Sequence, residues 1–233
     1  NDRTTAKIHI YKVDKESGKA VAQGDASLEG AVYGLYARNN IQHPDGATGV
    51  VFKAGDLVAT LTTDKNGEEE VNNLYLGNYY VKEITPSEGY LLDEEEHDVV
   101  CDYEGDLVAE VSRSTTSAEQ VIKQPFQLIK VSDNGDDTEA GLLAGAEFTA
   151  YLKSSLSVKA DGSYDFDKAT PVVIGENGAT TITSDDKGHA VSIAIPYGTY
   201  VVVESKTPHN MKTIKPFEVK IKENHPTEPQ TWR

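Results

Sequence analysis

The sequence contains very little sulfur and little positive charge. Cys101 is the single cysteine among 233 residues, so no disulfide can form within the chain. There are 22 lysines and arginines against 38 aspartates and glutamates, which gives a formal net charge of -16 at pH 7. This charge repels polyanions and argues against nucleic acid and anionic membranes as partners. In a small extracellular domain, another covalent link can take the place of a disulfide.

The sequence also lacks a signal peptide, a sorting tail and an apolar run long enough to span a bilayer. We therefore expect no membrane insertion within these residues. The start at Asn1 suggests an interior piece of a longer protein. Its length and its hydrophobic content of 38% fit two ordinary globular domains.

The sequence contains an internal repeat: four similar segments occur twice, about 120 residues apart. Such a repeat indicates tandem domains. The first copy comprises residues 8–13, 28–33, 63–67 and 76–83, and the second comprises residues 126–131, 143–148, 184–188 and 197–204. A proline follows each copy, Pro86 in the first and Pro208 in the second. We place the domains at 1–124 and 125–233, with almost no linker between them.

Both halves show short segments rich in β-branched and aromatic residues, separated by turns that carry glycine with Asp or Asn. The expected strands are 7–13, 31–37, 57–62, 78–84, 97–103 and 107–112, then 126–131, 147–152, 171–174, 189–195, 199–205 and 217–223. Hardly any helix is expected. This arrangement of short strands and glycine-containing turns predicts an all-β chain of two tandem antiparallel β-sandwich domains. Residues 39–48 and 154–167 are interpreted as surface insertions.

Each copy places one lysine and one glutamate alike. Lys12 and Lys130 lie in strands with apolar neighbours, and Glu83 and Glu204 each end a hydrophobic strand. Taken singly, each is most simply a solvated side chain. Their recurrence in the same context favours a buried pair, because burying either charge alone is costly.

Three motifs of the first copy resemble SpaA-type and CnaB-type domains, the prealbumin-like, isopeptide-forming modules of Gram-positive cell-wall-anchored adhesins and pilins. They are Lys-Val-Asp-Lys-Glu-Ser-Gly-Lys at 12–19, Leu-Glu-Gly-Ala-Val-Tyr at 28–33 and Gly-Asn-Tyr-Tyr-Val-Lys-Glu-Ile-Thr-Pro-Ser-Glu-Gly-Tyr at 77–90. The resemblance implies a prealbumin-like β-sandwich of the Ig-like topology class. It also implies that a first-strand lysine bonds to an Asn or Asp of the last strand while a glutamate assists.

By position, the resemblance pairs Lys12 with Glu83 and Lys130 with Glu204. The second copy departs from the pattern at 209–211, where His-Asn-Met replaces Glu-Gly-Tyr. Burial in an apolar pocket would favour the neutral amine, a nucleophile, and the neutral carboxylic acid, a proton donor. Such a bond forms once and acts on no external substrate.

The acceptor of this bond is not identified from the sequence. The family pattern puts an Asn or Asp just before the proline at the end of a domain, and Lys123 stands there instead. Domain one is then either uncrosslinked or uses another acceptor, such as Asp98 or Asp102. Domain two is expected to lack its final strand, with the partner of Lys130 beyond Arg233.

The function predicted is that of a structural stalk segment of a bacterial cell-surface adhesin or pilus-like protein. The expected location is extracellular, at the cell wall or surface of a Gram-positive bacterium. The expected partners are neighbouring domains of the same protein, with a host surface ligand as a further candidate.

The alternative is a ligand-binding adhesin module that recognises a host glycan or matrix protein through the insertions. No enzyme beyond single-turnover bond formation is predicted, and neither a cofactor nor a metal is expected.

Other polar clusters are interpreted as ordinary surface. The acidic stretches 133–137 and 161–167 have calcium-like oxygen spacing but lack the full ligand pattern of an EF-hand, so acidic turns are favoured. The run 93–98 is expected to be a solvated loop. Cys101 is expected to be a small strand residue, and the tyrosines of the first domain are assigned mainly to the core rather than to a sugar site.

Overall fold

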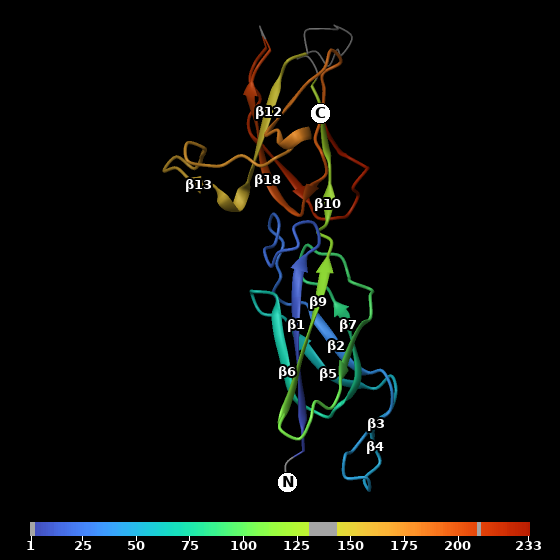
Figure 1. Ribbon diagram of the computed structural model, residues 1–233. Coiled ribbons are helices and arrows are strands. Elements are labelled where there is room, and N and C mark those ends of the chain that lie inside the picture. Colours follow the sequence, from blue (N-terminus) through green and yellow to red (C-terminus); the bar gives the residue numbers. More distant parts are fainter. Residues whose placement is uncertain (1–2, 131–143, 209–210) are drawn as a thin grey trace. The chain divides into compact units, whose positions relative to one another are not determined.

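The chain divides into two compact units, residues 1–121 and 122–233. The computed structural model describes residues 3–130, 144–208 and 211–233. Figure 1 shows that strands dominate each unit. Helix is limited, in these described residues, to the short 3-10 segments η1 (Lys153–Ser155) and η2 (Glu176–Gly178). The expected all-β class with tandem domains is confirmed.

Unit 1 is a sandwich of a three-stranded sheet, ordered β6-β1-β9, and a four-stranded sheet, ordered β5-β2-β7-β8. Its strands are β1 (Thr5–Asp14), β2 (Val32–Ala37), β3 (Ile41–Gln42), β4 (Val50–Phe52), β5 (Leu57–Thr62), β6 (Glu68–Leu74), β7 (Gly77–Thr85), β8 (His97–Cys101) and β9 (Glu110–Glu119). The short strands β3 and β4 pair as a separate ribbon.

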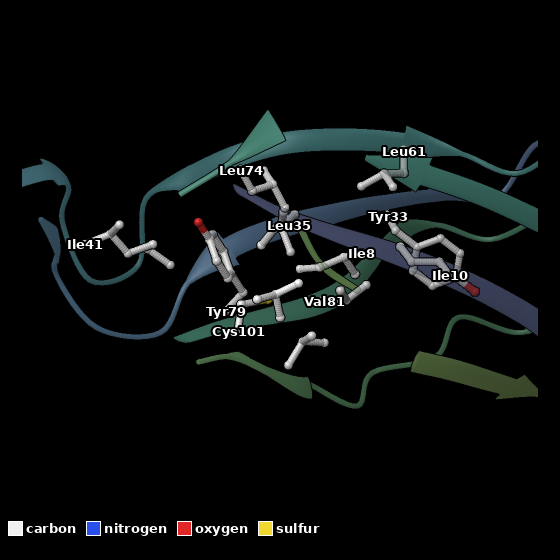
Figure 2. Close-up of a cluster of buried hydrophobic side chains, with 14 of the residues drawn as sticks. Ile8, Ile10, Tyr33, Leu35, Ile41, Leu61, Leu74, Tyr79, Val81 and Cys101 are labelled. Atoms are coloured by element: carbon white, nitrogen blue, oxygen red, sulfur yellow. The ribbon is translucent and has the colours of Figure 1, made fainter. Parts of the chain in front are cut away.

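The core of unit 1 lies between the two sheets, as Figure 2 shows. Successive side chains of a strand point to opposite faces, and β1 shows this alternation along its whole length. Ile8 and Ile10 of β1 pack with Tyr33 and Leu35 of β2 and with Val81 of β7, all of them buried. The same alternation carries Lys12 to the buried face of β1.

Unit 2 repeats this architecture, with sheets ordered β16-β11-β20 and β15-β12-β18-β19 and two further short ribbons. Its strands are β10 (Lys123–Gln124), β11 (Phe126–Ile129), β12 (Glu147–Leu152), β13 (Ser157–Val158), β14 (Tyr164–Asp165), β15 (Thr181–Thr183), β16 (His189–Val191), β17 (Ile195–Pro196), β18 (Gly198–Lys206), β19 (Phe217–Ile221) and β20 (Gln230–Trp232). Strand for strand, β11 corresponds to β1, β12 to β2, β18 to β7 and β20 to β9.

The pairs β1–β9 in unit 1 and β11–β20 in unit 2 are parallel, whereas the remaining strand pairs of the described chain are antiparallel. In unit 1, β1 and β9 pair from Thr5 opposite Glu110 to Asp14 opposite Glu119. In unit 2, β11 and β20 pair only from Phe126 to Leu128. A final strand was expected to be missing from unit 2, and the structure shows a short one.

Three local expectations are corrected. Residues 171–174 form no strand, although Ile174 is buried in the core of unit 2. The last strand of unit 1 begins at Glu110, not at residue 107, and Leu107 is fully exposed. The insertion at 39–48 is anchored in the core rather than confined to the surface, because Ile41 packs against the main cluster of unit 1.

The polar stretches with metal-like spacing have specific places. Residues 133–137 lie outside the described part of the chain. Asp161 accepts hydrogen bonds from the backbone and hydroxyl of Ser163, and Asp165 accepts one from the backbone of Asp167, so these carboxylates cap their own turns. No helix within the described ranges is long and apolar enough to cross a bilayer.

Candidate functional site

Lys12 is the centre of a buried polar cluster in unit 1. It shares the inner face of β1 with Ile10 and Asp14, and its side chain has no exposed surface. The backbone fixes this position from one side, because the Lys12 amide donates to the carbonyl of Gly67 at 2.7 Å. An ammonium in such a place requires a partner, since an unpaired buried charge is strongly destabilising.

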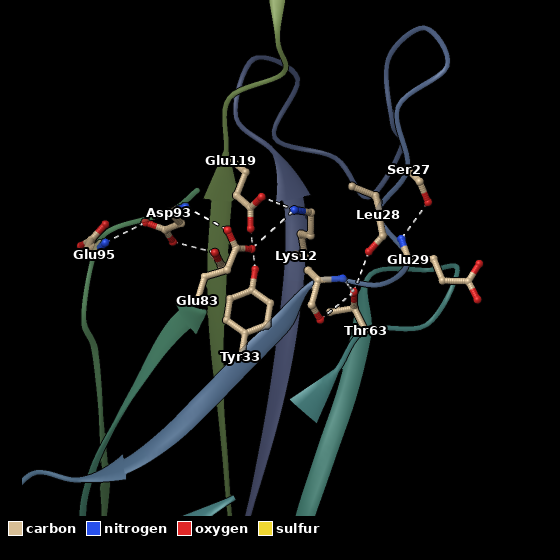
Figure 3. A network of polar contacts seen from close by, with 12 residues as sticks. Lys12, Ser27, Leu28, Glu29, Tyr33, Thr63, Glu83, Asp93, Glu95 and Glu119 are labelled. Carbon is tan, nitrogen blue, oxygen red and sulfur yellow. Dashed lines mark hydrogen bonds and ion pairs between the residues drawn. The ribbon is translucent and has the colours of Figure 1, made fainter. Parts of the chain in front are cut away.

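Two glutamates from different strands meet the Lys12 amine (Figure 3). The amine donates a hydrogen bond to Oε2 of Glu119, the last residue of β9. Oε2 of Glu83, on β7, lies 3.7 Å from the same nitrogen. Both carboxyl side chains are fully buried. The cluster therefore joins the first strand, the last strand and the facing sheet.

Two tyrosines complete the walls of the site. The hydroxyl of Tyr33, on β2, donates to Oε1 of Glu119 at 2.7 Å. Burial, and then the negative charge of Glu119, raises the pKa of Tyr33 above its ordinary value, so the hydroxyl keeps its proton. The ring of Tyr90 lies 4.8 Å from the Lys12 amine, and its hydroxyl donates to Asp14 at 2.8 Å.

Asp93 braces the cluster from the loop before β8. Its backbone amide donates to Oε1 of Glu83 at 3.0 Å. Its carboxylate accepts from the Ser117 hydroxyl at 2.6 Å and lies 2.7 Å from Nε2 of His97. Burial acts to raise the pKa of Asp93, but these bonds hold it below its ordinary value. The expected solvated loop at 93–98 thus contributes a half-buried support.

The protonation of Glu83 follows from its surroundings. Burial, followed by the neighbouring Glu119 carboxyl, raises the pKa of Glu83 to about 8. Oε2 of Glu83 is buried and has no hydrogen-bond partner among the described residues. At neutral pH this carboxyl therefore carries a proton beside the Lys12 amine. The site can offer a nucleophile, a carboxyl carbon and a proton donor within one dry pocket.

The corresponding site in unit 2 is simpler. The Lys130 amine donates to Oε2 of Glu204 at 2.6 Å, and both side chains are buried. Phe148 pairs with Glu204 in register, where Tyr33 pairs with Glu83 in unit 1, so the tyrosine hydroxyl is absent. Oε1 of Glu204 is buried without a hydrogen-bond partner in the described chain. No described residue of β20 lies in register with Lys130.

A pocket of about 440 Å³ opens beside Lys130. Its walls are mainly apolar and include Leu128, Phe148, Phe217 and Trp232. In unit 1, the C-terminal half of β9 with Ser117 and Glu119 lies next to the lysine instead. The two sites therefore differ in the partner that the last strand supplies.

The structure brings the predicted residues together in pairs, Lys12 with Glu83 and Lys130 with Glu204. It does not bring the suggested acceptors Asp98 and Asp102 to the site, because both are exposed and Asp98 binds Arg38 on the surface. Sequence reasoning missed Glu119.

The family pattern places the acceptor just before Pro125, where this chain has Lys123, so the pattern does not point to Glu119. The signal that could have found it is alternation. Side chains two residues apart in a strand lie on the same face. Ser117 and Glu119 therefore share one face of β9, beside Lys12 and Asp14 on the neighbouring strand β1.

Three side chains near the start of β8 have the spacing of metal ligands. One carboxylate oxygen of Asp93, one of Glu95 and a ring nitrogen of His97 lie within 4.8 Å of one another. Asp93 already accepts hydrogen bonds from Ser117 and contacts His97, which accounts for this geometry without an ion.

Comparison with known proteins agrees with this architecture. The family model described as "SpaA: Prealbumin-like fold domain" matches residues 6–115 and again residues 124–233. The chain belongs to the SpaA family. Both SpaA domains have a buried lysine, Lys12 on β1 and Lys130 directly after β11, so the family assignment and the repeated site coincide. No curated protein sequence matches the chain.

Solved structures with similar folds include the Bacillus anthracis TIE protein, which is 22% identical with a TM-score of 0.62. The match covers 99% of this SpaA chain and 34% of that protein, so the chain spans about a third of its relative. The streptococcal ancillary pilin is 25% identical over 100% of this chain and 62% of its own, with a TM-score of 0.36. GBS52, a minor pilin of Streptococcus agalactiae, is 19% identical over 97% and 93%, with a TM-score of 0.37.

Proposed function

We propose that the chain is a load-bearing segment of a Gram-positive cell-surface or pilus-like protein. The observation that carries this proposal is the parallel pairing of β1 with β9 over their full length. The chain enters unit 1 at one end of this pair and leaves at the other. Force on the two ends therefore acts along the strands, and the backbone hydrogen bonds between them share the load. Membership of the SpaA family supports a surface location.

The proposal includes an intramolecular isopeptide bond made by Lys12, with an acid-assisted mechanism that runs once. Lys12 is buried among carboxyl groups, and a bond from it to the last strand would carry force through covalent links. With one cysteine in the chain, a disulfide cannot do this. No external substrate is involved, and the functional partners are neighbouring domains of the same surface protein.

Single-molecule pulling on the full chain tests this function. A covalent link between β1 and the end of β9 would hide the segment from position 12 to position 119, a sequence separation of 107, from extension. We expect unit 1 to lack an unfolding step of about 370 Å, taking roughly 3.5 Å per residue. The step should appear in Lys12→Ala. Unfolding of unit 1 at low force in both proteins would contradict a load-bearing role.

A ligand-binding adhesin module is the second candidate, and one observation favours it. The hairpin of β13 and β14 extends from unit 2 and carries Tyr164, which with Phe166 and Tyr151 forms a group of contacting rings. A glycan or matrix protein that binds the full chain, and no longer binds after residues 157–165 are replaced by a short glycine turn, would establish this role. Retained binding would exclude the hairpin as the site.

A further inference from the structure

The two units offer their lysines different chemistry. In unit 1, Lys12 meets a second carboxyl, Glu119, that is held by a hydroxyl from Tyr33. In unit 2, Phe148 replaces that tyrosine, and Lys130 meets only Glu204 among the described carboxyls. The additional glutamate and the hydroxyl that binds it therefore occur together in one unit and are both missing from the described site of the other.

We propose that unit 1 forms a lysine–glutamate amide, in which Glu119 is the acceptor, Glu83 the proton donor and Tyr33 the group that holds the acceptor's carbonyl oxygen. This inference rests on the proposed function and names the partner of its reactive lysine. It replaces the Asn or Asp acceptor expected from the family resemblance with a glutamate at the end of β9.

The geometry assigns different tasks to the two oxygens of Glu119. Oε1 receives the Tyr33 hydroxyl at 2.7 Å, which suits the oxygen that becomes the amide carbonyl. Oε2 faces the Lys12 amine, which suits the oxygen that leaves. The carbon between them therefore lies within reach of the nucleophile, and a donor is already placed where negative charge develops during attack.

The reaction balances without an external reagent. Proton transfer within the Lys12 and Glu119 pair gives a neutral amine and a carboxylic acid. The amine nitrogen then bonds to the Glu119 carboxyl carbon, and its surplus proton passes by way of Glu83 to Oε2. The bond from that carbon to Oε2 breaks, and one water molecule leaves. Nothing is oxidised or reduced, and Glu83 ends in the protonation state in which it began.

Glu83 fits the donor role better than the acceptor role. Its Oε2 lies 3.7 Å from the amine, farther than Oε2 of Glu119, and its Oε1 is occupied by the backbone amide of Asp93. A Lys12–Glu83 bond would also join β1 to the facing sheet rather than to the last strand. The position of Glu119 at the end of β9 closes the unit across 107 residues.

Trypsin separates the two candidate acceptors cleanly. Lys12 lies in the peptide 8–15, Glu83 in the peptide 83–113 and Glu119 in the peptide 114–123. Intact mass of the folded full chain should be lower than the sequence mass by one water molecule. Digestion should yield peptide 8–15 joined to peptide 114–123. The control is Lys7→Ala, because Lys7 lies on the same strand but carries its charge at the surface. The intact mass of this variant should also be lower than its sequence mass by one water molecule.

Glu119→Ala should restore the full sequence mass. Glu119→Gln provides a second test, because a glutamine acceptor releases ammonia and yields a cross-linked protein of the same mass as cross-linked wild type. An unchanged wild-type mass, or peptide 8–15 joined to peptide 83–113, would overturn the assignment. If the water loss is absent while unit 1 still resists force, the acceptor assignment falls and the load-bearing role stands.

Discussion

At the scale of single residues, the site depends on burial that the sequence signals only by repetition. Lys12 and Glu83 could be found because each recurs in the second half of the chain, as Lys130 and Glu204. The described part of β20 pairs with β11 only as far as Leu128 and does not reach the position that matches Glu119, so repetition could not reveal Glu119. Tyr33 was assigned to core packing, and the structure shows that it packs in the core while its hydroxyl serves the site.

Removing the Tyr33 hydroxyl should both weaken unit 1 and slow bond formation. Tyr33→Phe leaves Oε1 of Glu119 buried without its donor, which costs about 1–3 kcal/mol. Loss of one donor to a developing oxyanion slows acyl chemistry by roughly 10²-fold or more. Mass spectrometry of samples taken during refolding from denaturant measures the rate.

Tyr79→Phe is the matched control for that experiment. Tyr79 is buried in the same core, and its hydroxyl donates to the backbone of Tyr75, away from the site. We expect this variant to lose some stability and to form the bond at the wild-type rate. Equal rates in all three proteins would remove Tyr33 from the mechanism.

The protonation of Glu83 predicts how the reaction depends on pH. The groups that face Glu83 are Lys12 on β1, Tyr33 on β2, Glu119 on β9 and the loop residue Asp93. Burial raises the pKa of Glu83 to about 8, so the proton donor is present below pH 8 and is lost as the pH rises through it.

Bond formation during refolding should therefore slow above pH 8. Glu83→Gln should slow it at every pH, by about 10²–10⁴-fold. A wild-type rate that instead climbs steadily to pH 10 would mean that deprotonation of the amine alone controls the reaction. Glu83 would then have no role as an acid.

The protonation of Glu83 also affects the free energy of unfolding, because its pKa differs between the folded and unfolded protein. The pKa of Glu83 is higher in the folded protein than its ordinary value of 4.5, so folding favours the protonated form. Its contribution to stability is fully present below pH 4.5 and is lost as the pH rises through about 8. Glu83→Gln should show a weaker decline in unfolding free energy over this range.

At the scale of strands, the pattern of buried side chains decided what could be predicted. The hydrophobic strands β2, β5, β7 and β12 were found because their composition shows them. Strand β6, with the sequence Glu-Glu-Glu-Val-Asn-Asn-Leu, was missed because its outer face is acidic and it lies at the edge of its sheet. Residues 171–174 look like a strand but bond to their neighbours without forming a ladder, since Val172 donates to Ala150 and Ile174 to Ala179.

The turn before β6 should be sensitive to substitution because it supports Lys12. Gly67 has a φ of 79°, and a Cβ there would lie 2.6 Å from the carbonyl oxygen of Lys12. Gly67→Ala should destabilise unit 1 by about 1–3 kcal/mol and displace the lysine. Thermal unfolding followed by circular dichroism measures the first effect, and the yield of cross-linked protein measures the second.

Gly46→Ala separates the clash from the backbone strain. Gly46 has a φ of 70°, but a Cβ there meets nothing within 4 Å. We expect a smaller loss of stability and a normal yield of cross-linked protein. If the two variants behave alike, the contact with Lys12 has no special importance.

At the scale of the whole molecule, we expect the two units to differ in stability. A link between positions 12 and 119 restricts the unfolded chain of unit 1, which adds about 4–5 kcal/mol on the loop-closure model. Unit 2 has no such link among its described residues. Calorimetry should show two transitions, and reducing agents should change neither, because Cys101 is the single cysteine.

Lys12→Met should lower the upper transition and leave the other in place. The matched variant Lys130→Met should act on the lower transition instead. A single transition that shifts equally in both variants would show that the lysines stabilise the units to the same degree. The proposed difference between the sites would then fail.

The most direct measurement is an experimental electron-density map of the folded chain at the Lys12 amine. We expect continuous density from this nitrogen to the Glu119 carboxyl carbon, with an amide C–N length of about 1.33 Å, and separate side chains at Lys130 and Glu204. An amine resolved apart from Glu119 at an ordinary charged hydrogen-bond distance of about 2.8 Å, with both carboxyl oxygens present, would contradict it.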